Sequence, residues 1–594
     1  MLYFLILSSI YQNATIKNMQ EHFHLVILNI IVALCTSIFI LLYIKIKKNK
    51  VNYLIILIVL SLMPLFSMIR SGPYESGDMQ INAIKTMSHF KSLSEGNLIP
   101  QWSGELNATY GYPLFLFTYP LPYYMGSLFH LIGFSFINSM KVDLALPYIL
   151  SGMFMFLYLK EKFSDLSSLI GSIFYLFAPY HLVDLHFRAT LGEMFAYIFL
   201  PLTLFIIDRS IHSNRMIYKI SLSISVALLT LSHQAISLFF VPILSLYIII
   251  FRKPRSPFTI LTALIPVLIG LLLSSFYWLP VIFETKFTHQ PEYAKTMEFS
   301  SLSQLIFSPW RYGLLFQGHY GELSFIIGYA HILIIIISIY LIIKRRIKKM
   351  DQELITFSLL LIILLSFMTT SYSKMIWDLV PIIKNFQFSW RLLAIIIFFN
   401  SIMAAVVVNS IKEKKIVVLL GIIAISYTML NWGNRGTIPA ITDNSLYKTL
   451  PESTAIDEGL APAIPKWTNS KFPFMAERPL YHLEISSGTG EFIQLERTST
   501  HHQYIINAKT NLLLRENTIY FPGWIILDNH KIITFNYSGT LTPGVISFNL
   551  SKGLHLLDVK YIDTQIVQLG KIISAITLIG MIPYFFSKRT SDIK

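Results

Sequence analysis

The sequence RLLAIIIFFNSIMAAVVV, residues 391–408, places seventeen uncharged and mostly apolar residues behind one arginine. A transmembrane helix needs about 20 consecutive, predominantly apolar residues, because the hydrocarbon core of a bilayer is about 30 Å thick. A charged side chain at the edge of such a run is costly in lipid, so it is a functional candidate. The stretch therefore predicts a membrane-spanning helix that begins at a candidate site residue, Arg391.

Further apolar runs of this kind occur along the chain when it is read with a window of about 19 residues. Together with 391–408 they cover residues 25–44, 53–69, 143–159, 167–180, 196–207, 218–231, 236–251, 259–279, 323–343, 355–369, 416–430 and 567–586. Hydrophobic residues make up 54% of the chain and charged residues only 13%, whereas soluble domains carry roughly 25% charged residues. We expect an all-α polytopic membrane protein with about 13 transmembrane helices.

The net charge of +15 is spread between the apolar runs and does not form one basic patch beside exposed aromatics, so nucleic acid is not an expected partner. Basic clusters close or precede the runs, at Lys45–Lys50, Lys160 and Lys162, Arg209–Lys219, Arg252–Arg255, Lys344–Lys349, Lys412–Lys415 and Lys588–Lys594. Cytoplasmic loops carry an excess of Lys and Arg. The pattern predicts that these clusters, including the C-terminal tail, face the cytoplasm.

With that orientation, alternate segments face outward: 70–141, 181–193, the turn at His233, 280–322, 371–390 and 431–565. The first of them is rich in Tyr and Pro, which suits amphipathic helices in the membrane interface. A helical hairpin that dips through the membrane is the alternative interpretation. The apolar stretch 1–10 lacks the basic start of a signal sequence. Three interpretations of this stretch stay open: a poor signal sequence, an extra partial span, or a tail on the outside of the membrane.

After residue 430 the apolar runs become short and alternating, and 545–550 and 554–561 are the clearest of them. Turn signals such as Asp528-Asn529 and Pro543-Gly544 separate them. We expect three parts. They are a polytopic transmembrane domain (1–430) with the large outer loop 70–141, an extracytoplasmic β-rich domain (431–565), and a final helix with a basic cytoplasmic tail (566–594).

Two acids, Glu75 and Asp78, follow directly after an early span. A carboxylate at this place is suited to act as a general base or to hold a divalent cation. The plain alternative is a solvated loop acid, which is the better interpretation for an isolated Asp.

A second group lies between two apolar spans and comprises His181, Asp184, His186, Arg188 and Glu193. In a helix Asp184 and Arg188 stand at i, i+4 and pair, so the group is either a site or an interfacial salt bridge. Its spacing matches no zinc signature, which makes a metal site the weaker interpretation.

His233 and Arg391 complete the candidates, each at the expected outer end of a helix. The planar fork of arginine binds phosphate oxygens in pairs. A single arginine there is explained as a membrane anchor, but Arg188 and Arg391 on the same face as Asp78 favour a phosphate-bearing lipid ligand.

Several other classes of protein are disfavoured by missing motifs. The chain has no Walker A motif, dinucleotide fingerprint, GxSxG or HExxH. Its only cysteine, Cys35, lies in an apolar run, so no intramolecular disulfide or cysteine metal cluster is expected.

Taken together, these segments resemble the bacterial membrane proteins labelled 6-pyruvoyl-tetrahydropterin synthase-related. The resemblance is carried by GNLIPQW at 96–102, YGYPLF at 110–115, PYHLVDLHFRATLGE at 179–193, LSH at 231–233, FQFSWR at 386–391 and FPGW at 521–524. Two departures are Ser389, where a proline is expected before Trp-Arg, and the lack of a histidine within one turn of Asp78, since His89 lies well beyond it.

That family looks like part of the GT-C class of glycosyltransferases, which use polyprenyl-phosphate-linked sugars at the outer leaflet. The resemblance implies that Asp78 is the base or cation-holding residue, that Arg188 and Arg391 hold the donor phosphate, and that Glu193 and His233 line the cavity. A divalent cation, Mg²⁺ or Mn²⁺, is allowed, but its ligands are unknown. The pterin-synthase label implies no such activity here, because that chemistry uses a soluble fold with a zinc site and a cysteine.

We therefore expect a glycosyltransferase of the bacterial cytoplasmic membrane. Its partners would be a lipid-linked sugar donor, membrane lipid, and a glycan, lipid or protein acceptor. Two alternatives stay open: a transporter or flippase for a lipid or lipid-linked sugar, which predicts inverted repeats and interrupted helices that the sequence does not reveal, and a non-catalytic scaffold that binds glycan.

Overall fold

The computed structural model describes residues 2–212, 215–252, 256–293, 297–307, 325–384, 386, 388–429, 432–433, 437–449, 463–468, 479–540 and 542–586. The side chains of residues 2–23 and a few others next to the gaps are not described. The predicted basic tail at 588–594 and much of the predicted outer loop 280–322 lie outside the described residues.

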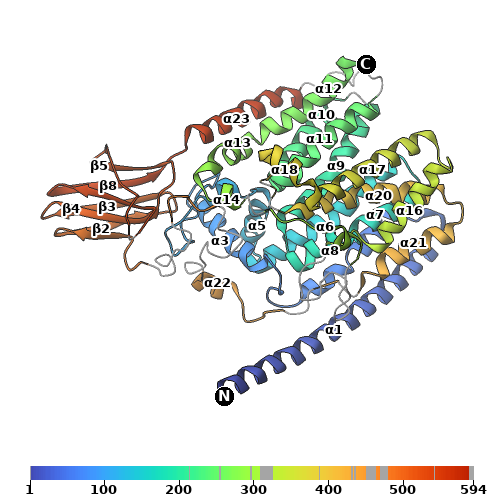
Figure 1. Ribbon diagram of the computed structural model, residues 1–594, viewed down its shortest axis with the longest axis horizontal. Coiled ribbons are helices and arrows are strands. Elements are labelled where there is room, and N and C mark those ends of the chain that lie inside the picture. The colour runs from blue at the N-terminus through green and yellow to red at the C-terminus, as the bar shows by residue number, and fades with distance from the viewer. Residues whose placement is uncertain are drawn as a thin grey trace.

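Helices form the body of the molecule, and strands form a second unit at one end of it (Figure 1). The longer helices are α1 (Leu2–Lys47), α3 (Met79–Ser94), α5 (Leu121–Leu131), α6 (Phe136–Lys160), α7 (Asp165–Leu176), α9 (Leu191–His212), α10 (Met216–Ser232), α11 (Gln234–Phe251), α12 (Pro257–Leu273), α13 (Ser275–Glu284), α16 (Tyr329–Ile343), α17 (Lys349–Met368), α20 (Leu393–Ser410), α21 (Lys414–Ser426) and α23 (Gln565–Phe586). Shorter α-helices are α2 (Tyr53–Ser61), α4 (Leu114–Phe117), α8 (Pro179–Val183), α14 (Gln290–Tyr293), α15 (Leu302–Ile306), α18 (Lys374–Leu379), α19 (Pro381–Lys384) and α22 (Asp443–Thr449). Single 3-10 or π turns are η1 (Lys48–Lys50), η2 (Pro64–Ile69), η3 (Asp184–Arg188), η4 (Thr285–Phe287), η6 (Ser371–Ser373) and η7 (Ser389–Leu392).

Helix α20 is the centre of the body. All of its residues from Leu393 to Val408 are buried, so neighbouring protein segments, and not lipid, cover every side of this apolar helix. It packs against α7, α16 and α17. The start of α20, which carries Arg391, is therefore fixed by the core of the protein.

Each predicted span falls on a helix or on a bent pair of helices. Among the described residues, 7 helices are long and apolar enough to cross a membrane, or up to 9 if each bent pair is one span. Further apolar helices, at Tyr53–Ile69, Met216–Ser232 and Tyr329–Ile343, are shorter. The membrane class and the helical fold are confirmed, and the count of about 13 spans stays a prediction.

Two spans are interrupted, which the sequence did not reveal. The pair Asp165–Leu176 and Pro179–Arg188 is bent by 50°, and the pair Pro257–Leu273 and Ser275–Phe287 is bent by 69°. At the first break Ala178 is extended (ψ 136°) before Pro179, as expected for a residue that precedes proline. The 167–180 run thus ends inside the body and turns toward α9.

The C-terminal strands form two antiparallel sheets, of order β1-β4-β7 and β2-β3-β8-β5-β6. Their strands are β1 (Leu483–Ser487), β2 (Gly490–Arg497), β3 (His501–Ala508), β4 (Leu512–Ile519), β5 (Trp524–Asp528), β6 (Lys531–Ile533), β7 (Val545–Leu550) and β8 (Gly553–Tyr561). Inward residues of both sheets share one hydrophobic core. The predicted β-rich region is confirmed, and its two clearest predicted strands are β7 and β8.

Two of the contacts that attach the strand domain to the helical body lie at α23 and at the first outer loop. Helix α23 runs back from β8 along α13 and α12 (Figure 1), where Ser275 Oγ donates a hydrogen bond to the Gly570 carbonyl (3.0 Å). The other attachment is the first outer loop. Trp102 meets Trp524 edge to face, with ring centroids 5.2 Å apart, so the GNLIPQW and FPGW segments contact each other across the junction.

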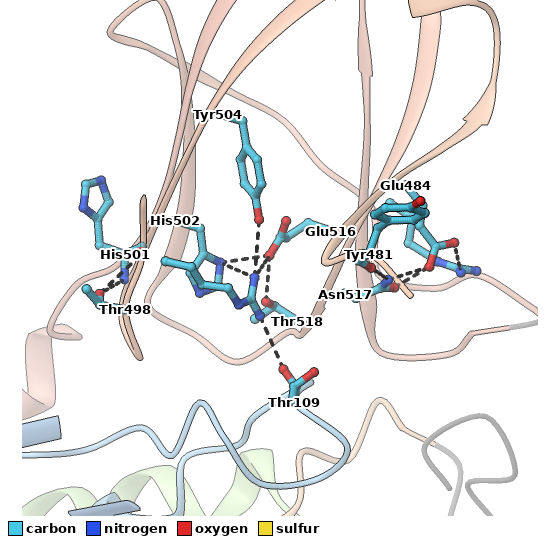
Figure 2. Close-up of polar contacts among 12 residues, drawn as sticks. Thr109, Tyr481, Glu484, Thr498, His501, His502, Tyr504, Glu516, Asn517 and Thr518 are labelled. Atoms are coloured by element: carbon cyan, nitrogen blue, oxygen red, sulfur yellow. Dashed lines mark hydrogen bonds and ion pairs between the residues drawn. The ribbon is translucent and has the colours of Figure 1, made fainter. Parts of the chain in front are cut away.

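A buried ionic network lies on the strand side of that junction (Figure 2). Glu516 Oε1 accepts hydrogen bonds from His502 Nδ1 (2.8 Å) and Arg497 Nη1 (2.8 Å). Arg497 Nη2 then donates to the carbonyl of Thr109 in the first outer loop (3.3 Å). The loop that bears Asp78 is thus tied to the strand domain through a fully buried carboxylate.

Candidate functional site

The candidate site forms where the helical span is interrupted between α7 and α9. After α8 the backbone makes a π turn, η3, and Ala189 adopts the left-handed conformation (φ 55°). Single π turns in helices occur frequently at functional sites, and left-handed backbone at a non-glycine residue is uncommon. This geometry brings polar side chains from residues 180–193 together in one buried cluster.

Arg188 is the centre of the cluster. Its Nη1 donates to Asp184 Oδ1 (2.6 Å) and to Tyr180 Oη (2.8 Å), and its Nη2 lies 2.8 Å from Glu193 Oε1. The Tyr180 hydroxyl donates to Glu193 Oε2 (2.8 Å), and the Tyr197 hydroxyl donates to Asp184 Oδ2 (3.0 Å). The predicted Asp184–Arg188 pair is present, inside a network that holds the guanidinium in one orientation.

Arg391 enters the same network from the start of α20. Its Nε lies 3.4 Å from Glu193 Oε1, its Nη1 donates to the Phe386 carbonyl (2.9 Å), and its guanidinium lies over the Phe388 ring at 4.9 Å. No hydrogen bond within the described part of the chain uses its Nη2. Glu193 therefore bridges two arginines, and Arg391 keeps donors for a ligand.

Asp78 reaches this cluster through main-chain hydrogen bonds. The Gly77 N–H donates to the Phe187 carbonyl (2.8 Å) and the Asp78 N–H to the Arg188 carbonyl (2.9 Å), while Asn82 Nδ2 donates to the Ala189 carbonyl (3.0 Å). Asp78 precedes α3, but its side chain does not cap that helix. Residues far apart in the sequence thus form one site.

The Asp78 carboxylate is partly exposed and set among cations. Burial by the surrounding protein raises its pKa above the usual value, and the charges of Lys85, Arg188 and Arg391 oppose that shift. Burial likewise lowers the pKa of Lys85. A carboxylate with a raised pKa is a better proton acceptor than a free one.

Lys85 is a site residue that the sequence reasoning missed. It lies on α3 two turns beyond Asp78, so the helical period places both side chains on one face. The helical spacing between Asp78 and Lys85 is the sequence signal that could have identified Lys85 as a site residue. Tyr119 was also missed: its ring stacks on His233 at a centroid distance of 5.4 Å, and its phenol lies within electrostatic reach of Asp78 and Arg391.

The remaining predicted residues divide into two groups. His233 belongs to the site edge: it is buried, precedes α11, and its Nδ1 accepts from the Ile236 N–H (3.3 Å). His181 stacks on Tyr197 (4.0 Å) and hydrogen-bonds the Tyr175 carbonyl (3.0 Å), so it supports the cluster from behind. Glu75 is exposed, and no hydrogen bond or ion pair given for the described residues joins it to the cluster.

The described residues do not fit a metal centre. No group of three or more His, Cys, Asp or Glu side chains among them is placed to hold a metal ion. Asp78 faces cations instead. The positive charge at this site is supplied by the side chains of Lys85, Arg188 and Arg391.

A groove that is open to the surface lies beside the cluster, between the first outer loop, α13 and α23. Its lining includes His89, Phe115, Tyr124, Tyr277 and Lys571. Tyr119 and Tyr123, stacked at 6.1 Å, link the groove to the site, because the Tyr123 hydroxyl donates to Asn82 (3.1 Å). The site therefore has an adjoining, largely apolar space.

Comparison with known proteins finds a family match and weaker likenesses. The family described as "6-pyruvoyl-tetrahydropterin synthase related domain; membrane protein" matches residues 115–434. An uncharacterised protein of Lactococcus lactis subsp. cremoris (strain MG1363) is 24% identical over 208 residues, which are 34% of this chain and 34% of that protein. The match thus spans about a third of the relative's length.

Among solved structures, the arabinofuranosyltransferase AftD from Mycobacteria has a TM-score of 0.44 and 15% identity, covering 66% of this chain and 27% of AftD. The archaeal oligosaccharyltransferase AglB from Archaeoglobus fulgidus, in complex with an inhibitory peptide and a dolichol-phosphate, has a TM-score of 0.38 and 13% identity, covering 65% of this chain and 56% of AglB. Both TM-scores lie below 0.5.

Proposed function

The chain belongs to the 6-pyruvoyl-tetrahydropterin synthase related family of membrane proteins, and we propose that it is a glycosyltransferase. It moves a sugar from a polyprenyl-phosphate-linked donor to a glycan, lipid or protein acceptor at the outer face of the bacterial cytoplasmic membrane. One observation carries the proposal: Asp78 hydrogen-bonds through its main chain to Arg188, which sets one carboxylate among the cations Lys85, Arg188 and Arg391.

In the proposed reaction the Asp78 carboxylate takes the proton of the acceptor hydroxyl. The acceptor oxygen forms a bond to the anomeric carbon of the donor sugar as the bond from that carbon to the phosphate oxygen breaks. The electron pair stays on the polyprenyl phosphate. This single displacement inverts the anomeric centre.

Arg188 and Arg391 are proposed to stabilise the leaving phosphate. Glu193 holds both guanidinium groups, so their dipoles and charges need no rearrangement as the phosphate gains charge. The Nη2 of Arg391 makes no hydrogen bond among the described residues and is available to donate to a ligand. Guanidinium groups bind phosphate oxygens strongly. The apolar groove beside the site suits a lipid chain. No step is routed through a metal, because the described residues do not form its ligand set.

The test is transfer by purified protein in proteoliposomes, supplied with radiolabelled polyprenyl-phosphate sugars and candidate acceptors. Loss of a positioned base costs about 10²–10⁴-fold in rate, so Asp78→Asn should lose at least about a hundredfold, and Arg391→Ala a comparable amount. The matched control is Glu105→Gln, an acid of the same loop that pairs with Lys91. EDTA should leave transfer unchanged.

Full transfer by Asp78→Asn would refute the site assignment. Wild-type protein that transfers no sugar from any donor but moves the lipid across the bilayer would instead support the second candidate, a lipid or lipid-linked sugar transporter. The two bent helix pairs favour that candidate, because interrupted helices line substrate sites in transporters.

A further inference from the structure

A second hollow lies at the opposite ends of the helices that form the site. It is a hollow that is open to the surface and is lined by the end of α9, the start of α10, the residue after α11 and the first turns of α12. The site lies at the other ends of α9, α10 and α11. Glu193 of the site and Ser210 of the pocket both lie on α9, and their positions in the sequence place them about 26 Å apart along the helix axis, which is close to the thickness of a bilayer core.

The pocket wall is cationic. Lys219 and Arg252 line it together with Ser210 and Thr262, and no acid contributes to the lining. Within the described part of the chain neither cation forms an ion pair. Asp208, which precedes Ser210 on α9, is paired with Lys162 (2.8 Å), and Glu161 is paired with Arg209 (2.6 Å).

The guanidinium of Arg252 is anchored by one hydrogen bond, but its Nε–H lacks an acceptor among the described residues. Its Nη1 donates to the Ser210 carbonyl (3.2 Å), which fixes the guanidinium at the pocket. Its Nε is buried and has no hydrogen-bond partner. A buried donor without a partner loses its hydrogen bond to water and gains none in return, so the geometry favours an acceptor supplied from outside the chain.

The other wall of the pocket is apolar, formed by Leu222, Ala263 and Pro266. A pocket between transmembrane helices that combines two cations, hydroxyl groups and an apolar wall matches a phosphate ester that carries acyl chains. Basic pockets of this kind on the cytoplasmic side bind anionic headgroups. The charge pattern of the sequence predicts that this end of the helices faces the cytoplasm.

We propose that the pocket between Lys219 and Arg252 binds the phosphate headgroup of an anionic phospholipid in the leaflet opposite the candidate site. Arg252 and Lys219 bind the phosphate oxygens, while the hydroxyls of Ser210 and Thr262 donate to the carbonyls of Ile207 and Thr259 and line the pocket beside the headgroup. The first part of an acyl chain packs on Leu222 and Pro266. This assignment does not depend on the proposed glycosyl transfer.

The experiment titrates the full-length protein in detergent with dioleoyl phosphatidylglycerol and counts bound lipid by native mass spectrometry. Phosphatidylcholine and inorganic phosphate form two further arms. The variant Lys219→Gln/Arg252→Gln should bind phosphatidylglycerol about thirtyfold more weakly than wild type. The control Lys344→Gln/Arg345→Gln removes two exposed charges from another basic cluster and should stay within about twofold of wild type.

Ala263→Leu separates pocket filling from charge, because it narrows the hollow while both cations remain. It should also lower phosphatidylglycerol binding and leave the melting temperature near that of wild type. Equal phosphatidylglycerol binding by wild type and the Lys219/Arg252 variant would overturn the proposal. Occupancy by inorganic phosphate without phosphatidylglycerol would overturn the lipid assignment.

Discussion

Asp78 and Lys85 are placed by α3 on one face of the helix, and their charges act on each other. The lysine lowers the pKa of the carboxylate, since a nearby cation favours the charged form. Lys85→Gln should therefore raise the pKa of Asp78. The acid limb of the pH profile of kcat/KM should move to higher pH.

Lys91→Gln is the control for that change, because Lys91 lies further along the same helix and pairs with Glu105. A pH profile of Lys85→Gln that coincides with the wild-type profile would show that Asp78 is not the titrating base.

At the scale of single residues, the sequence indicated Asp78, Arg188, Glu193 and Arg391 because charged side chains next to apolar runs are conspicuous. The charge pattern did not separate Asp78 from Glu75, which lies three positions earlier, and only the family resemblance favoured Asp78. The structure separates them, since only Asp78 hydrogen-bonds to the chain at Arg188. Which of the two is catalytic stays a prediction until it is measured.

At the scale of elements, the Glu516 network controls how the strands hold the first outer loop. Burial alone would raise the pKa of Glu516, but His502 and Arg497 hold it at about 2, below the ordinary 4.5. A depressed pKa means that the stabilisation is present above about pH 4.5 and is lost as the pH falls toward 2, on the order of 3 kcal/mol.

Glu516→Gln should therefore destabilise the strand domain at pH 7 by about 3–5 kcal/mol, because Arg497 is left as a buried cation without its counter-charge. Limited proteolysis of the full-length protein reports the loss as faster cleavage between β1 and β8. Glu491→Gln on the exposed edge of β2 should cleave at the wild-type rate. Equal cleavage of both variants would mean that the network does not stabilise the domain.

The Glu516 network contacts a turn of the first outer loop whose backbone conformation is unusual. Asn107, Ala108 and Thr109 all adopt left-handed backbone, with φ of 60°, 50° and 70°. Such conformations cost of order 1–3 kcal/mol each for non-glycine residues and persist only where surrounding contacts hold them. The hydrogen bond from Arg497 to Thr109 and that from the Ile519 N–H to the Tyr110 carbonyl (3.0 Å) are such contacts. No sequence pattern predicted this turn, since its residues carry no glycine.

At the scale of the whole molecule, the charge pattern predicts that Ser94 and Lys344 lie on opposite sides of the membrane. Cys35 is the only cysteine, so a Cys35→Ser background accepts single cysteines at either position. In intact cells a membrane-impermeant maleimide should label Ser94→Cys and leave Lys344→Cys unlabelled until the membrane is opened. Labelling of Lys344→Cys alone would invert the topology and move the site to the cytoplasmic face.

The sequence by itself determined the membrane class, the positions of the apolar helices, the β-rich region near the C-terminus and most of the candidate residues. Hydropathy, charge bias and strand alternation are local properties, so a short window of residues contains them. The interruption at 177–189, the place of Lys85, the supporting role of His181 and the meeting of Trp102 with Trp524 were decided by the tertiary structure alone. The physical reason is that they depend on main-chain hydrogen bonds and ring contacts between segments far apart in sequence. The most consequential is the pairing of 77–78 with 187–188, which no window along the chain contains.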